Sequence, residues 1–209
     1  GDARPLRCRM VAPGGWSLQR HWDGEGPDTQ QAVREGPWDF VVLQDFSVQA
    51  VIAPDALAEY GRRFAELARQ VGAEPVLYVT WARQHMPEMQ AGITRQYAAL
   101  GRLSGSRLAP VGEAWKAALE ARADLVLHTA DRSHPTPAGS YLAACVFYAT
   151  LTGRSPVGLP GRLVVRGEGG VEQVAADLDG ELSAFLQQTA WRTVGLWQPA
   201  PRADGARET

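Results

Sequence analysis

Short continuous apolar runs alternate along the chain with longer segments in which apolar residues recur every third or fourth position. Runs of the first kind are typical of strands buried on both faces of a sheet, and segments of the second kind are typical of amphipathic helices. The first predicted strand alternates apolar and basic residues, which indicates one buried face. Strands are predicted at residues 6–11, 38–44, 76–81, 107–111 and 163–165.

The clearest predicted helix covers residues 54–72, because Leu57, Phe64 and Val71 share one face and Gly72 ends it. Gly180 interrupts the last predicted helix, where Asp179 is a second possible N-cap. Helices alternating with strands predict an α/β fold, a three-layer α/β/α sandwich with a mainly parallel sheet. The other helices are predicted at residues 24–36, 87–103, 113–122, 140–152 and 171–194.

Composition and charge set further limits. A chain of 209 residues has room for one domain with a sizeable core, which we place at residues 1–198, followed by a disordered tail at 199–209. The net charge of −2 gives no electrostatic footprint for nucleic acid or an anionic membrane. No stretch has the length and hydrophobicity of a transmembrane helix, and no signal peptide opens the sequence. Cys8 and Cys145 lie among apolar residues and are expected to be buried free thiols.

The segment between residues 128 and 139 carries the most specific candidate chemistry. Asp131 precedes His134 by three positions, so its carboxylate can accept a hydrogen bond from one imidazole nitrogen and leave the other free to act as a base. The alternative is that Asp131 caps a turn and His134 is an ordinary surface histidine. Thr136 is a predicted N-cap, with Pro137 at the first position of the following helix.

Other candidates follow predicted strands, and the carboxyl ends of parallel strands meet at one edge of a sheet. Gly15 could offer its N–H to an oxyanion or simply form a turn. Gln44 could be a second oxyanion donor or could bond neighbouring backbone, and Asp45 is expected to bond a loop. No zinc-ligand spacing and no phosphate loop occurs, so no metal or cofactor is predicted. His21 is expected to be structural, and two further histidines, His85 and His128, are expected to lie at the surface or behind the residues of a site.

Three blocks in this order resemble the GDSL-like or SGNH hydrolases, which are serine esterases with a flavodoxin-like fold. The blocks are Gly14-Gly15-Trp16-Ser17-Leu18, Val42-Leu43-Gln44 and Asp131-Arg132-Ser133-His134-Pro135. The resemblance implies that His134 is the general base, that Asp131 orients it and that Gly15 is an oxyanion donor. Gln44 stands where most members have asparagine. Trp16, Ser17, Asp45 and Trp81 are candidates for the lining of a pocket, and a secreted or periplasmic location is compatible with the resemblance.

The sequence departs from this family at its start. Members carry the nucleophilic serine in a turn after their first, central strand, whereas this sequence opens Gly1-Asp2-Ala3. We therefore expect that strand and its serine to lie upstream of residue 1, leaving a gap between the strands at 6–11 and 40–44. Ser17 and Ser47 lie in loops, but the family pattern makes neither the nucleophile. The expected activity is hydrolysis of a small-molecule or carbohydrate ester, and the alternative is a non-catalytic carbohydrate- or partner-binding module.

Overall fold

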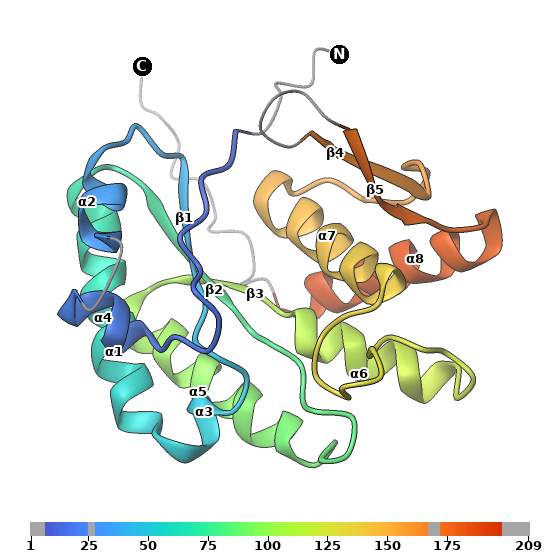
Figure 1. Ribbon diagram of the computed structural model, residues 1–209, viewed down its shortest axis with the longest axis horizontal. Coiled ribbons are helices and arrows are strands. Elements are labelled where there is room, and N and C mark those ends of the chain that lie inside the picture. Colours follow the sequence, from blue (N-terminus) through green and yellow to red (C-terminus); the bar gives the residue numbers. More distant parts are fainter. Residues whose placement is uncertain (1–6, 25–27, 167–171, 198–209) are drawn as a thin grey trace, which may run out of the picture.

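A parallel sheet of three strands forms the centre of the computed structural model, which describes residues 7–24, 28–166 and 172–197. The strands β1 (Phe40–Leu43), β2 (Glu74–Tyr78) and β3 (Arg107–Ala109) lie side by side in that order (Figure 1). Leu77 lies opposite Leu43 on one side and Leu108 on the other. The prediction of an α/β chain with a parallel sheet is thereby confirmed.

The two faces of β2 look into two separate cores, because successive side chains of a strand point to opposite faces. Leu77 packs in a cluster with residues of α1, α4 and α5, whereas Val76 packs in a cluster with residues of α6, α7 and α8. The sheet therefore has helices on both faces. The helices are α1 (Leu18–Asp23), α2 (Thr29–Arg34), α3 (Gln49–Ile52), α4 (Pro54–Gln70), α5 (Met89–Ser104), α6 (Val111–Ala121), α7 (Pro137–Thr152) and α8 (Gly180–Trp197).

Residues 7–11 do not form the strand that their alternation predicts. They run alongside β1 without a backbone hydrogen bond to it among the described residues, and residues 7–10 are exposed (Figure 1). Cys8 is exposed with them, so the prediction of a buried thiol there is wrong, while Cys145 is buried as expected. A strand exists only through its pairing with a neighbour, and nothing among the described residues pairs with this segment.

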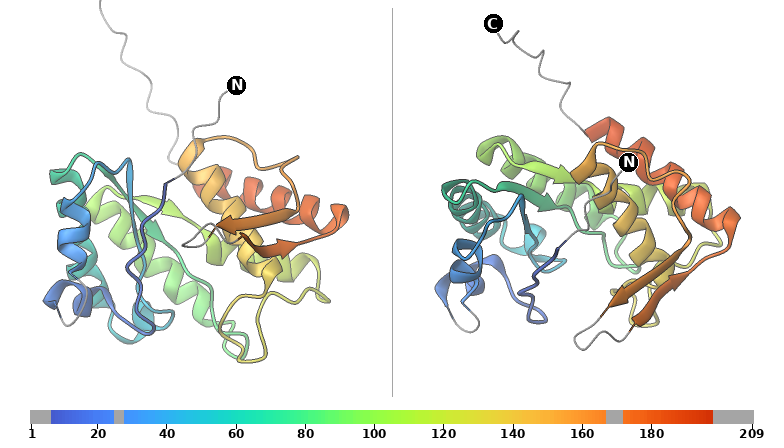
Figure 2. Two further views of the ribbon diagram at one scale, coloured as in Figure 1. Left: turned by 45° about the horizontal axis from the view of Figure 1, so that its top comes forward. Right: turned by 90° about the horizontal axis from the view of Figure 1, so that it is seen from above.

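The first part of the helix predicted at 171–194 is also wrong. Glu172–Asp177 is a strand, β5, paired antiparallel with β4 (Arg162–Arg166), and this ribbon lies beside α7, apart from the parallel sheet (Figure 2). Cross-strand ion pairs, Arg162 with Asp177 at 2.6 Å and Arg166 with Glu172 at 3.0 Å, favour the ribbon over a helix. Residue 171 and the predicted tail at 199–209 lie outside the described residues.

Two predicted N-caps are confirmed. Asp179 accepts a hydrogen bond from the N–H of Leu182 at 2.8 Å, and α8 begins beside it at Gly180. Thr136 accepts from the N–H of Gly139 at 3.2 Å, and Pro137 is the first residue of α7. The second cap matters for the site, because it ends the loop that carries Asp131 and His134 and fixes where α7 starts.

Candidate functional site

The loop between α6 and α7 is closed at its base by backbone hydrogen bonds. His128 and Pro135 form an antiparallel bridge, and the N–H of Thr136 donates to the carbonyl of Leu127 at 2.8 Å. Nearer the tip, the N–H of Thr129 donates to the carbonyl of His134 at 2.9 Å. The loop is thus a small hairpin whose two sides are joined by backbone hydrogen bonds, and residues 130–133 form its turn.

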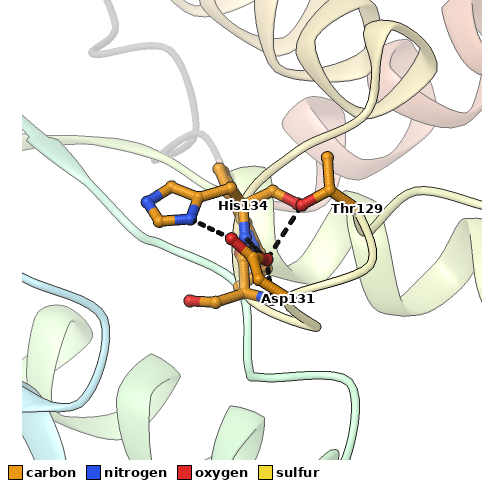
Figure 3. A network of polar contacts seen from close by, with 5 residues as sticks. Thr129, Asp131 and His134 are labelled. Carbon is orange, nitrogen blue, oxygen red and sulfur yellow. Dashed lines mark hydrogen bonds and ion pairs between the residues drawn. The ribbon is translucent and has the colours of Figure 1, made fainter.

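Asp131 is the centre of this turn. Its Oδ1 accepts from the backbone N–H groups of Ser133 at 2.8 Å and His134 at 2.9 Å, and from the Thr129 hydroxyl at 2.8 Å (Figure 3). A φ of +63° at Arg132 turns the chain so that two successive N–H groups reach one carboxylate. These donors hold the pKa of Asp131 well below its usual range. The backbone N–H of His134 contributes most to this lowering, and the His134 imidazole contributes next.

The second oxygen of Asp131 orients the imidazole. Its Oδ2 lies 2.5 Å from Nδ1 of His134, the hydrogen bond that the spacing of the two residues allows. An ionised carboxylate there holds the proton on Nδ1, so that Nε2 carries the lone pair. The ring points away from the loop and its side chain is 79% exposed, and no described residue forms a hydrogen bond with Nε2 (Figure 3). This arrangement can accept a proton at Nε2.

A groove of about 1090 Å³ lies between residues 7–16 and the segment that contains β1. Its walls are mostly residues 7–16 on one side and residues 36–46 on the other, with Leu151 and Phe64 among the rest. Gly15, Trp16, Gln44 and Asp45 belong to the lining, whereas Ser17, Trp81, Asp131 and His134 do not. The structure therefore brings the two predicted oxyanion donors to one groove and places the imidazole outside its lining.

The two predicted oxyanion donors, Gly15 and Gln44, have N–H groups that form no hydrogen bond with the described residues. Gly15 adopts a φ of +71° in a turn in which the N–H of Trp16 donates to the carbonyl of Pro13 at 3.3 Å, and a side-chain carbon there would meet no atom of the described residues within 4 Å. Gln44 is exposed, and no described residue hydrogen-bonds to its amide. Both residues could therefore present N–H donors to a bound group.

Asp45 binds a loop, as its position after β1 indicates. Its Oδ1 accepts from its neighbour Phe46 at 2.9 Å, the backbone N–H of Leu18 donates to its carboxylate, and its own N–H donates to the hydroxyl of Tyr97 at 3.1 Å. It is only 1% exposed, and its Oδ2 has no partner among the described residues. Burial raises the pKa of Asp45 to about 6 against the opposing effect of these two N–H donors. The carboxylate joins the end of β1 to the start of α1.

The remaining candidates have structural contacts. Ser17 is the N-cap of α1, where its hydroxyl oxygen accepts from the N–H of Arg20 at 3.2 Å. The Arg20 guanidinium lies 4.7 Å from the centre of the Trp16 ring. Trp81 follows β2 and donates its indole N–H to the carbonyl of Ser133 at 2.9 Å, which is a contact with the histidine loop.

The other histidines have separate places. His21 is buried and its Nδ1 lies 2.8 Å from the Thr29 hydroxyl; burial first and the nearby Arg20 second lower its pKa. His85 is exposed. His128 is buried, not on the surface, and its Nε2 lies 3.1 Å from the carbonyl of Ala82. Burial is also the main reason that the pKa of His128 is lowered.

The sequence pattern does not single out Thr129, whose hydroxyl donates to Asp131. A threonine two residues before an aspartate in a turn is a recognisable signal for such a bond. Within the described part of the chain no three histidine, cysteine, aspartate or glutamate side chains gather so as to hold a metal ion. The helices among the same residues include none with the length and hydrophobicity needed to cross a membrane.

Comparisons with known proteins bear on the family. No protein-family model and no curated protein matches the sequence. The solved structure of a DUF4886 family protein from Bacteroides uniformis has the same fold, with a TM-score of 0.68 at 19% identity over 87% of this chain and 80% of that one.

A second solved structure shares more of the sequence. It is described as "a putative SGNH hydrolase" from Slackia heliotrinireducens, with a TM-score of 0.58 and 32% identity over 66% of this chain and 80% of that one. The contact between His134 and Asp131 is the one that the third sequence block, Asp131-Arg132-Ser133-His134-Pro135, predicts. At 32% identity across 80% of the Slackia protein, this chain belongs to the family of SGNH hydrolases.

Proposed function

We propose that this chain is the part of an SGNH-type serine esterase that carries the general base, built as a flavodoxin-like three-layer sandwich. The observation that carries the proposal is the hydrogen bond between Asp131 and Nδ1 of His134, which leaves Nε2 exposed and without a hydrogen-bond partner in the part of the chain that the structure describes. An imidazole oriented in this way can take a proton from a serine hydroxyl.

The nucleophile is a serine outside the described residues. No serine hydroxyl in residues 7–24, 28–166 or 172–197 is hydrogen-bonded to His134, and the hydroxyl of Ser17 is used as a helix cap. From the family resemblance we expect the missing serine in a turn after a strand upstream of residue 1. The groove between residues 7–16 and β1 supports that placement, because β1 is an edge strand and a parallel strand laid in the groove could pair with it.

In the proposed reaction the serine oxygen attacks the carbonyl carbon of the ester while Nε2 of His134 takes its proton. The N–H of Gly15 and the amide of Gln44 donate to the oxyanion of the tetrahedral intermediate. His134 then gives its proton to the leaving alcohol, and water releases the acid from the acyl-serine by the same steps in reverse order. Each oxyanion donor in such a site contributes about a hundredfold to a thousandfold to kcat.

The substrate proposed is an ester of a small molecule or a carbohydrate, such as an acetylated sugar. Trp16 lies in the groove wall next to Gly15, where an aromatic ring can pack against the apolar face of a sugar. The alternative, a non-catalytic binding module, draws on the same absence of a described serine beside His134. The esterase and the binding module are distinguished by whether the protein hydrolyses esters when the residues upstream of residue 1 are present.

We predict that the chain of residues 1–209 hydrolyses p-nitrophenyl acetate no faster than its own His134→Ala variant, because it lacks the nucleophile. The form that also contains the residues encoded upstream of residue 1 should hydrolyse the ester, unfold at a higher temperature and associate less. A strand paired with β1 adds backbone hydrogen bonds worth about 0.5–1.5 kcal/mol each, against a domain stability of about 5–15 kcal/mol.

The measurement is ester hydrolysis together with thermal unfolding and molecular mass for both forms. A cooperative monomer of residues 1–209 that hydrolyses the ester at an enzymatic rate would overturn the placement of the nucleophile. An upstream-extended form that is stable and monomeric yet inactive on short acyl esters would favour the binding module.

A further inference from the structure

An aromatic stack lies against the loop that carries His134. The rings of Trp81 and Trp115 are parallel, 4.3 Å apart with an interplanar angle of 7°, and the His128 ring packs edge-on against Trp115 at 4.9 Å. Trp81 follows β2, Trp115 belongs to α6, and His128 lies at the start of the loop. The stack thus joins the carboxyl end of the central strand to the segment that holds the proposed base.

The position of this stack is fixed on the α7 side. A side-chain carbon at Gly139 would lie 2.4 Å from the Trp115 ring and 2.6 Å from the carbonyl of Leu127, so only glycine lets the first turn of α7 pack this closely. On the β2 side the carbonyl of Ala82 accepts from His128 Nε2–H, and the N–H of Gln84 donates to the carbonyl of Arg132 at 2.9 Å. The segment after β2 therefore holds the loop at several points.

One of these points is the peptide group that precedes His134. Its carbonyl, on Ser133, accepts the Trp81 indole N–H at 2.9 Å, and its N–H, on His134, donates to Oδ1 of Asp131 at 2.9 Å. A planar peptide group held by hydrogen bonds at both ends has its orientation set. That orientation aims the Cα–Cβ bond of His134 and thereby places Nδ1 against Oδ2 of Asp131.

We propose that Trp81 is a positioning residue for the His134 base, acting through the Ser133–His134 peptide group. The inference rests on the proposed function for its catalytic meaning, and it gives Trp81 a role other than the pocket lining expected from the sequence. Its indole N–H is committed to Ser133, one ring face is covered by Trp115, and it is absent from the lining of the groove.

The test compares Trp81→Phe with Trp115→Phe. Both variants keep an aromatic ring and remove an indole N–H, but the N–H of Trp115 has no hydrogen-bond partner among the described residues. Only Trp81→Phe therefore releases the peptide group. The readout is deuterium exchange of the His134 backbone amide measured by NMR, taken relative to the amide of Leu77 in the central strand to correct for changes in global stability.

In Trp81→Phe we expect the relative exchange of the His134 amide to be about tenfold faster, the effect of losing one hydrogen bond, and in Trp115→Phe to change less than about threefold. An unchanged His134 amide in Trp81→Phe, or equal acceleration in both variants, would overturn the inference. In the upstream-extended form Trp81→Phe should also lower kcat about tenfold with little change in KM. If the exchange result holds but no form hydrolyses esters, the proposed function fails and the positioning role of Trp81 stands. If the extended form hydrolyses esters but Trp81→Phe changes neither the exchange nor kcat, the proposed function stands and the positioning role fails.

Discussion

Replacing His134 with alanine should lower kcat for p-nitrophenyl acetate by about a thousandfold or more in the form of the protein that carries its nucleophile. Without the imidazole the serine hydroxyl keeps its proton at neutral pH, and the leaving alcohol receives none. KM should change little, because Nε2 contacts the reacting atoms and contributes little to binding the ground state.

The matched control is His85→Ala. His85 is also an exposed histidine. Its neighbour Gln84 donates to the carbonyl of Arg132, but no hydrogen bond joins His85 itself to the Asp131 loop among the described residues, so it should be replaceable without loss of activity. Asp131→Asn should cost about a hundredfold or more, because an amide nitrogen facing Nδ1 favours the wrong tautomer of His134. Full activity in His134→Ala would exclude the proposed mechanism, whatever the other variants did.

The second large effect is on stability. The pKa of Asp45 is raised by burial to about 6, from 3.8 for an unburied aspartate. Because the pKa of Asp45 is higher in the folded protein than in the unfolded chain, ionisation of this carboxyl group destabilises the folded state. This penalty is absent below pH 4 and complete above pH 6. Its full size is about 3 kcal/mol. Asp45→Asn should therefore raise the free energy of unfolding by about 1–3 kcal/mol at pH 8, with the gain shrinking to nothing near pH 4.

Urea unfolding of the wild type and Asp45→Asn between pH 4 and pH 8 measures this difference. The gain falls below the full penalty because the amide nitrogen of asparagine still lacks a partner at the position of Oδ2. Asp55→Asn, at an exposed carboxylate in the first turn of α4, is the control and should destabilise by well under about 1 kcal/mol. A loss of stability in Asp45→Asn at pH 8 would show that the N–H groups around Asp45 require its charge.

The sequence predicts best where the interaction is local. Asp131 and His134 are three residues apart, so their hydrogen bond needs only a turn. The cap of α7 by Thr136 has the same local origin. The contact of Trp81 with Ser133 spans 52 positions and depends on how α6 packs against the sheet, so no spacing rule could predict it.

The two wrong elements failed for a non-local reason. Residues 7–11 have the alternation of a strand, but a strand also needs a neighbour, and β1 does not pair with them. Residues 172–177 contain good helix formers, yet the cross-strand partners in β4 make them a strand. Gly15 and Gln44 line one groove even though residues 7–11 before Gly15 form no strand, whereas His134 lies outside that lining.

The most direct test of the proposed esterase is to find the serine that reacts. The upstream-extended form and the chain of residues 1–209 are each treated with a serine-reactive fluorophosphonate, and the modified peptide is identified by mass spectrometry. We predict a single label on a serine upstream of residue 1 in the extended form, its loss in His134→Ala, and no label on the shorter chain. A label on Ser17 or Ser47 in either form, or labelling that persists without His134, would contradict it.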